Sequence, residues 1–347
     1  MEGRSVDDGT GWLRLAASLV NVSLLTLIVP TYRRPSDLLR CLESVQEQTL
    51  QHFELIVVDN AADDEVAGGV AEFNRHARIQ ARYVPEPRLG LHNARHAGVR
   101  AASGDVLVFT DDDATFDPRW LEAYARRFVS HPEMAAAGGP ARPVWEVPPP
   151  AWLPPFMHCQ PKMFPILSLL EPFEEFRLTH DGYFFGVNMA IRRQPLVDVG
   201  GFNPDSFGSV WLGDGETGLN RKLWQRNLLI GYVPDAVVYH HVRAERMTLT
   251  YFRRREANDG ACDMYARFHR DGVPDRVGLV RAGAEIALHS ARDWLASLVL
   301  RGRTDPRSLR VQLRAARAWA RLEYVGRLLV HPELRELVSR RDWLQSN

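Results

Sequence analysis

The segment VLVFTDDDATFDP, residues 106–118, joins an apolar run to three consecutive aspartates, Asp111, Asp112 and Asp113. Its first four residues are all apolar, which is typical of a strand that is buried on both faces. Carboxylates this close together repel one another. The segment therefore predicts a buried strand that ends in a cluster of carboxylates. The rest of the sequence must explain why these carboxylates are clustered.

Similar strands precede this segment, with helices between them. Apolar strands are predicted at 24–30, 54–60 and 81–87. Helices are predicted between the strands at 37–48 (with Ser36 as the N-cap), 65–77 and 91–103. Such alternation predicts an α/β fold, a mostly parallel sheet flanked by helices. Because ligands bind beyond the carboxyl ends of parallel strands, we expect Asp59 and the three aspartates to share one crevice.

The remainder of the chain is less regular. A helix is predicted at 120–131 and strands at 182–193 and 232–242. Residues 140–172 hold 10 of the 22 prolines and are predicted to be a long loop or lid without regular structure. We expect the chain to divide into an N-terminal extension at 1–23, a main α/β domain at 24–245 and an Arg-rich helical region at 246–347.

Composition limits the class of protein. The chain has 347 residues, 45% hydrophobic and 25% charged, as in ordinary globular proteins. Lys+Arg and Asp+Glu are both 43, so net charge gives no case for a nucleic-acid partner. Three scattered cysteines favour reduced thiols over a disulfide framework or a zinc site. No signal peptide or membrane-spanning run is apparent, which predicts a cytoplasmic protein.

The aspartate triplet has two interpretations. Aspartate favours turns and caps, which would make the triplet a structural feature. Alternatively, carboxylate oxygens at a strand end bind Mg²⁺ or Mn²⁺, and a cation would relieve the repulsion. If the segment stays extended, Asp111 and Asp113 point to the same side and can act together.

Two other segments carry candidate groups. In VYHHV, His240 and His241 are adjacent in a strand, so only one of them can face a given site. Each is either structural or a metal ligand. In WLGDGETGL, Asp214 and Glu216 precede a helix, where a carboxylate serves as an N-cap or as a general base.

Together these segments resemble the family-2 glycosyltransferases of the GT-A fold. The resemblance covers residues 24 to about 255 and rests on four runs: TLIVPTYRRPSDLLRCLESVQEQTLQHFELIVVDN, GLHNARHAGVRAASGDVLVFTDDDATFDPRWLE, GVNMAIRR followed by VGGF, and VPDAVVYHHV. It implies inverting transfer of a sugar from a nucleotide-diphosphate sugar, most often UDP-linked, to an acceptor hydroxyl, with Mn²⁺ or Mg²⁺. The triplet matches the family's DxD motif.

The resemblance also implies roles for individual residues. Asp113 would bind the metal with His240, or with His241 as the alternative. The general base would be Glu216 if the family motif is counted back from Leu219, or Asp214 if its leading Gly-acid pair is matched. The nucleotide sugar would contact Pro30, Thr31, Tyr32, Arg34, Asp59, Arg95, Asp111, Asp112, Gly186 and Asn188. Separately from the resemblance, Trp152 and Trp211 are either candidates for the acceptor wall, since sugars and lipids pack on aromatic faces, or simply part of the core.

Other functions remain open from the sequence. One is a catalytically silent relative that binds a nucleotide and acts as an interaction protein. Another is a sugar nucleotidyltransferase, although the loop after the first strand lacks the Gly-rich phosphate motif. Residues 246–347 carry 20 Arg and 12 acids, against 23 bases and 31 acids before them. This basic region could cap the catalytic domain, form a homodimer or contact the inner face of a membrane peripherally.

Overall fold

The computed structural model describes residues 25–207 and 210–344, and the expected N-terminal extension lies outside them. Its main feature is an eight-stranded sheet with the strand order β10-β14-β6-β11-β4-β1-β2-β3. One half of the sheet is parallel and contains β1 (Leu25–Thr31), β2 (Glu54–Asp59), β3 (Ala81–Pro85) and β4 (Val106–Phe109). The other half is mixed and contains β6 (Met134–Gly138), β10 (Arg177–Thr179), β11 (Met189–Arg192) and β14 (Leu229–Tyr232), with β11 antiparallel to both its neighbours.

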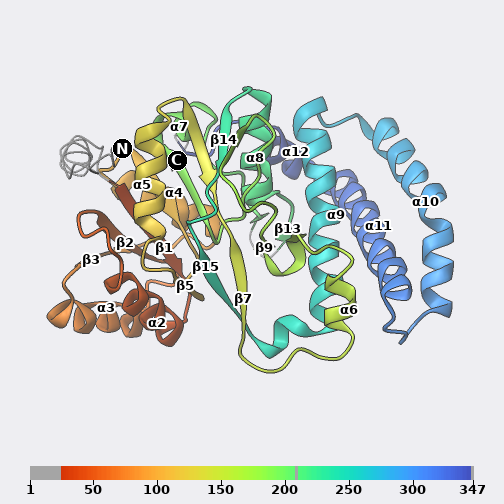
Figure 1. The fold of residues 1–347 in the computed structure, drawn as a ribbon. Helices are drawn as coiled ribbons and strands as arrows, with labels where there is room; N and C mark the ends of the chain where they lie inside the picture. Colours follow the sequence, from red (N-terminus) through yellow and green to blue (C-terminus); the bar gives the residue numbers. More distant parts are fainter. Residues whose placement is uncertain (1–24, 208–209, 345–347) are drawn as a thin grey trace, which may run out of the picture.

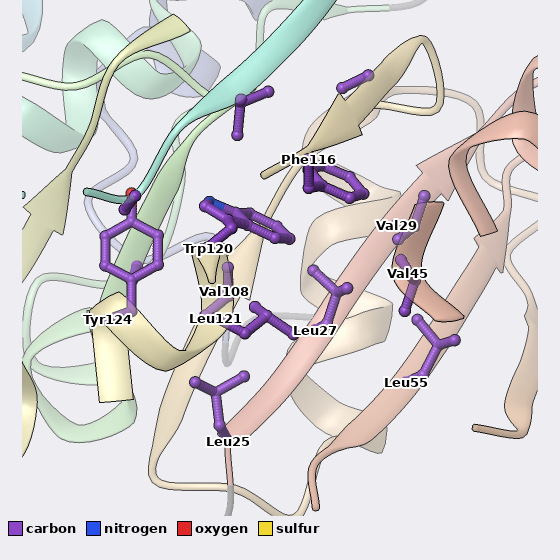
Figure 2. Close-up of a cluster of buried hydrophobic side chains, with 14 of the residues drawn as sticks. Leu25, Leu27, Val29, Val45, Leu55, Val108, Phe116, Trp120, Leu121 and Tyr124 are labelled. Carbon is purple, nitrogen blue, oxygen red and sulfur yellow. The ribbon is translucent and has the colours of Figure 1, made fainter. Parts of the chain in front are cut away.

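Helices cover both faces of this sheet because successive strand residues point to opposite sides. Leu27 and Val29 of β1 pack in one core with α2 (Pro35–Gln46), whereas Ile28 packs in another with α4 (Leu91–Ala101). Figure 2 shows the first core, where Trp120 of α5 (Trp120–Ser130) stacks on Phe116 at a centroid distance of 4.1 Å. The other helices of these layers are α3 (Asp64–His76), α7 (Arg193–Asp198) and α8 (Gly215–Gln225).

A second sheet contradicts the expected loop at 140–172. Its order is β5-β15-β7-β9-β8, and its strands are β5 (Ala114–Phe116), β7 (Ala141–Trp145), β8 (Met163–Phe164), β9 (Leu169–Leu170) and β15 (Val238–Val242). The same segment also contains α6 (Leu153–Met157) and the 3₁₀ turn η1 (Pro165–Leu167). Strand β7 tolerates Pro143 because its pairing with β9 involves only Ala141, which leaves that edge without ladder hydrogen bonds.

Two other local predictions were wrong. The single strand expected at 232–242 is two strands, since β14 ends at Tyr232 in the main sheet and β15 begins at Val238 in the second. Helix α2 begins at Pro35, so Ser36 lies inside the helix rather than capping it. Proline at the first helical position has its φ already set for a helix, and it needs no partner for a missing N–H.

The C-terminal region is a layer of helices beside the sheets, shown in cyan to blue in Figure 1. After the 3₁₀ turn η2 (Ala244–Met247) come α9 (Leu249–Asp271), α10 (Arg276–Val299), α11 (Pro306–Val330) and α12 (Glu333–Ser339). Helix α9 lies between the second sheet and α11: its Phe252 packs on Phe164 of β8, and its Asp263 pairs with Arg317. Among the described residues, no helix is long and apolar enough to cross a membrane. Self-association and peripheral membrane contact stay predictions.

Candidate active site

The three aspartates lie in a turn at the carboxyl end of β4, next to the ends of β1 and β2. A cavity of about 400 Å³ opens there, which we call the first cavity. Its walls include Pro30 and Thr31 at the end of β1 and Tyr32 directly after it, together with Asn60, Arg34, Arg246 and all three aspartates. The predicted crevice therefore exists, although the turn abolishes the expected alternation between Asp111 and Asp113.

Asp112 and Asp113 share one cationic neighbour. Nη1 of Arg34 lies 3.2 Å from Oδ1 of Asp112 and 3.3 Å from Oδ2 of Asp113. The hydroxyl of Thr31 donates to Oδ2 of Asp112 at 2.8 Å. Burial and the charge of Asp113 raise the pKa of Asp112 to about 6. The end of β1 thus organises two of the three carboxylates.

Asp113 is also held from the second sheet. Nη2 of Arg246 donates to its Oδ2 at 2.8 Å, and Nε2 of His240 lies 3.4 Å from its Oδ1. Burial alone would raise the pKa of Asp113, but the charges of Arg246 and Arg34 outweigh it and keep that pKa low. Oδ1 is buried and has no hydrogen-bond partner.

The two adjacent histidines have different surroundings. Nδ1 of His240 contacts the carbonyl oxygen of Leu167 at 3.0 Å, so we assign the ring proton to Nδ1. Its Nε2 then presents a lone pair toward Asp113 and Arg246. His241 points the other way, with Nε2 3.0 Å from the hydroxyl of Thr115. Of the two metal-ligand candidates, the structure brings only His240 to the aspartates.

Asp111 belongs to a separate cluster centred on Arg95 of α4. Arg95 is 1% exposed, and its Nη2 lies 3.6 Å from Oδ1 of Asp111 while its Nη1 donates to Oε2 of Glu216 at 3.2 Å. A Cβ at Gly186 would collide with this guanidinium, so the close approach requires glycine there. Arg95 thereby joins the aspartate turn to the start of α8.

The environment of Glu216 keeps it ionised. Although burial raises the pKa of Glu216, the charge of Arg95 outweighs this and lowers it. Asp214, the other candidate base, accepts from Nδ2 of Asn203 at 2.9 Å and from Nη1 of Arg221 at 3.1 Å. The Asp214 side chain is 3% exposed and that of Glu216 is 23% exposed. Asp214 is therefore engaged in hydrogen bonds that stabilise its own loop. Glu216 instead shares the guanidinium group of Arg95 with Asp111.

Asp205 is a further acid that the sequence did not reveal. A Cβ at Gly215 would collide with its carboxylate, and Gly215 has a φ of +47°. Burial and the nearby charge of Glu216 raise the pKa of Asp205 to about 7. In the run GFNPDS it follows a proline and looks like an ordinary turn residue, so only the folding of this loop against α8 exposes its role.

Other predicted residues serve the frame around the cavity. Asp59 is fully buried and accepts from the backbone N–H groups of Ala61 and Asp63 and from the hydroxyl of Tyr83. Burial and the hydrogen bond to Asp59 raise the pKa of Tyr83 to about 12. Asp59 thus shapes the loop after β2, and its neighbour Asn60 lines the cavity.

Asn188 also lies in the frame, in a different part of it. Its Oδ1 accepts from Nε1 of Trp120 at 2.9 Å and from the hydroxyl of Tyr124 at 2.7 Å, and its Nδ2 donates to the carbonyl oxygens of Pro140 and Ala236. All of its hydrogen-bonding capacity is therefore used inside the protein. The structure does not bring Asn188 to the aspartates.

The three aromatic candidates lie in different parts of the structure. Tyr32 is 43% exposed and lines the first cavity. Trp211, in the short hairpin of β12 (Ser206–Phe207) and β13 (Val210–Trp211), lines a second cavity of about 720 Å³. Trp152 packs edge-on against Phe252 in the core under α9 and lines neither cavity.

The described residues contain no ready cluster of three or more His, Cys, Asp or Glu side chains that could hold a metal ion. Asp113 and His240 are a pair, and Arg246 lies against both of them. A cation at this point would take its remaining ligands from substrate or water, as Mg²⁺ usually does in phosphate sites.

Residues 26–200, which carry the parallel strands and the aspartate turn, match the family model "Glycosyl transferase family 2". The chain belongs to this family. Its similarity to a glucosyl-dolichyl phosphate glucuronosyltransferase of Haloferax volcanii is 27% identity over 188 residues, 52% of this chain and 56% of that protein. Its similarity to a validoxylamine A glucosyltransferase of Streptomyces hygroscopicus subsp. jinggangensis is 32% identity over 125 residues, 35% of this chain and 27% of that protein.

This family member thus spans about half the length, or less, of these two relatives. Over 94% of its length it resembles the solved structure of the mannosyltransferase PcManGT from Pyrobaculum calidifontis, in complex with GDP-Man and Mn²⁺, covering 82% of that chain. The TM-score is 0.55 and the sequence identity 19%. At this identity the likeness establishes the fold, and it confirms the expected GT-A type α/β architecture.

Proposed function

We propose that this protein is an inverting glycosyltransferase that moves a sugar from a nucleotide-diphosphate sugar, UDP-linked, to an acceptor hydroxyl. The observation that carries the proposal is the bridge made by Arg95, which holds the ionised Glu216 beside Asp111 at the strand-end turn. A carboxylate base next to a strand-end carboxylate cluster places proton removal beside the region where a diphosphate leaving group would lie.

The first cavity suits the nucleotide part of the donor. It lies beyond the carboxyl ends of β1 and β4, where ligands bind in sheets of this type. The exposed Tyr32 ring offers a face for stacking a base, and Arg34 and Arg246 bring positive charge toward a diphosphate. Asp59 supports the cavity through its loop instead of contacting the nucleotide directly.

The residues around Asp113 fit a divalent cation, Mn²⁺ or Mg²⁺. Oδ1 of Asp113 is buried without a hydrogen-bond partner, and Nε2 of His240 directs its lone pair to the same side. Asp113 and His240 would hold the ion, and its charge would stabilise the departing diphosphate. Arg34 and Arg246 add positive charge to this wall from the protein itself.

Glu216 acts as the general base. Because the pKa of Glu216 is lowered, the side chain is a carboxylate at neutral pH and accepts the proton of the acceptor hydroxyl. The hydroxyl oxygen then bonds to the anomeric carbon as the bond from that carbon to the diphosphate breaks, with inversion. Arg95 fixes the direction of the Glu216 carboxylate, and Gly186 leaves room for Arg95.

Calorimetric titration with UDP, GDP and dTDP, with and without Mn²⁺, tests the donor site. We expect the wild type to bind UDP in a Mn²⁺-dependent way and Asp113→Ala to lose that dependence. Turnover of UDP-sugars then separates a transferase, which releases UDP, from a nucleotidyltransferase, which releases UMP or pyrophosphate, and from a silent relative. If the folded wild type binds no nucleotide, the proposal is wrong.

A further inference from the structure

The second cavity adjoins the first and is lined by five arginines. It measures about 720 Å³, and the two cavities share Arg34, Asp113, Ser206 and Arg246. The other arginines in its wall are Arg243, Arg254 and Arg255, against which only Asp113 and Glu245 are acidic. An arginine-rich wall of this kind attracts an anion.

Three of these arginines already have carboxylate partners. Arg34 and Arg246 contact Asp113, and Arg243 contacts Asp37. Their charges are therefore partly neutralised by the protein. They form the side of the cavity that faces the proposed donor site.

The two arginines of α9 differ from the other three. Within residues 25–207 and 210–344, neither Arg254 nor Arg255 has an ion pair or a guanidinium hydrogen bond. Arg254 is exposed and lies over the ring of Tyr251 at 5.3 Å. Arg255 is partly buried, and although burial lowers its pKa, the nearby Tyr251, Asp259 and Glu216 outweigh this and raise it. Because the described residues use none of their N–H donors, both guanidinium groups can donate to an anion that enters the cavity.

The rest of the wall suits an organic molecule that carries this anion. Trp211 and Tyr251 provide aromatic surface, and Nε1 of Trp211 is held 3.4 Å from Sγ of Cys262, which fixes the indole. Thr250 and Asn258 add a hydroxyl and an amide. Two guanidinium groups that line one cavity with such donors match the charge and the hydrogen-bonding needs of a phosphate group.

The second cavity also lies on the side of the proposed base. Ser206 in its wall follows Asp205, whose carboxylate lies against Gly215 at the start of α8, and the charge of Arg255 acts on both Glu216 and Asp205. A nucleotide in the first cavity would meet Arg34 and Arg246 and would leave Arg254 and Arg255 free for another molecule. The acceptor is the other molecule that the reaction requires.

We propose that the second cavity is an acceptor subsite that selects a phosphate-bearing acceptor through Arg254 and Arg255. This inference rests on the proposed function for the direction of transfer. The phosphate stays intact: it binds the two guanidinium groups while a hydroxyl elsewhere on the same molecule reaches Glu216.

Binding of glucose 1-phosphate, with methyl glucoside as the uncharged probe, tests this subsite by calorimetry on the full chain saturated with UDP and Mn²⁺. We expect glucose 1-phosphate to bind more tightly than methyl glucoside, and Arg254→Gln and Arg255→Gln each to weaken it about 10- to 100-fold, the range for a lost charged hydrogen bond. Their affinity for UDP should stay within about 2-fold of the wild type. Arg253→Gln is the matched control, because Arg253 is the neighbouring residue and donates to Gln312 of α11 instead of lining the cavity.

Four outcomes would overturn the inference. They are equal affinity for both probes, no binding of glucose 1-phosphate at millimolar concentration, an equal loss in Arg253→Gln, and a parallel loss of UDP affinity, which would assign the two arginines to the donor diphosphate. A variant counts only if its melting curve matches that of the wild type. If UDP fails to bind and Arg255-dependent phosphate binding persists, the donor assignment fails and the anion subsite stands.

Discussion

The two cavities that share Asp113 differ in which charge predominates in their walls. In the first, three carboxylates line the wall against two guanidinium groups, and the buried Oδ1 of Asp113 has no hydrogen-bond partner. In the second, guanidinium groups outnumber carboxylates, and Arg254 and Arg255 have no ion pair or hydrogen bond within the described residues. The imbalance on each side indicates what is missing from it: a cation in the first cavity and an anion in the second.

This difference explains why one wall serves both cavities. Asp113 and the two arginines paired with it, Arg34 and Arg246, form the wall between an acidic and a basic cavity. A donor diphosphate with its cation would complete the first cavity, and a phosphate-bearing acceptor the second. Substitutions that change the charge on one side alone should therefore affect one substrate and spare the other.

The largest effect is expected at the base. Glu216→Gln should lower kcat by about 10²- to 10⁴-fold, the range for a lost general base, and leave nucleotide affinity unchanged. Asp214→Asn is the matched control on the same segment. Because Asp214 accepts from Asn203 and Arg221, its substitution should lower the melting temperature and have the smaller effect on kcat. The opposite ranking of the two variants in a steady-state assay would assign the base to Asp214.

The next largest effect is expected at the wall between the two cavities. Asp113→Asn should reduce turnover by about 10²- to 10³-fold, as when a group that stabilises developing charge is removed. It should also abolish the Mn²⁺ dependence of UDP binding. Asp112→Asn is the control inside the triplet, since Asp112 contacts Thr31 and Arg34 but does not contact His240. Equal loss of Mn²⁺ dependence in both variants would show that the triplet acts as a unit.

The strand-end part of the site follows from the sequence because its residues sit where parallel strands must end. Thr31, Asp59 and Asp111–Asp113 come directly after apolar runs, and the alternation of strands and helices brings those ends to one edge. The expected direction of two side chains was wrong. Because the segment turns at Asp112 instead of staying extended, Asp111 and Asp113 lie in separate clusters.

The other part of the site depends on tertiary contacts that no local pattern encodes. Asp205 and Arg246 lie in a loop and a short 3₁₀ turn, and Arg255 is one of three successive arginines at the start of a long helix. Which of the three arginines faces the cavity depends on how α9 packs against α11. The prediction of a loop for the Pro-rich segment was wrong for a related reason. Pairing of β7 with β15 overrides the local preference of proline for loops.

A smaller effect is expected from the contact between Gly186 and Arg95. Gly186→Ala places a methyl group against a guanidinium that is 1% exposed and cannot swing into solvent. Displacing Arg95 would loosen Glu216 and Asp111 together, and we expect kcat to fall by about 10-fold with little change in UDP affinity. Gly69→Ala is the control, because nothing lies within 4 Å of its added methyl group. Unchanged kcat in Gly186→Ala would mean that Arg95 does not position the base.

The smallest effect is expected at Asp205, and it depends on pH. Burial and the charge of Glu216 raise the pKa of Asp205 from its usual value near 4 to about 7. The folded state therefore binds this proton more tightly than the unfolded state, and the contribution of Asp205 to stability declines as pH rises from about 4 to about 7. Asp205→Asn removes that decline, so its melting temperature should exceed that of the wild type by about 2 °C or more at pH 8 and by less at pH 5.

The same substitution tests how the two acids interact. With the charge of Asp205 removed, the pKa of Glu216 should fall further, and the acidic limb of the kcat profile should move to lower pH. Asp198→Asn, at the exposed last residue of α7, is a control that should move neither the limb nor the melting temperature at pH 8. A limb that stays in place in Asp205→Asn would mean that the two carboxylates titrate independently. The basic cavity would then act on Glu216 through Arg255 alone.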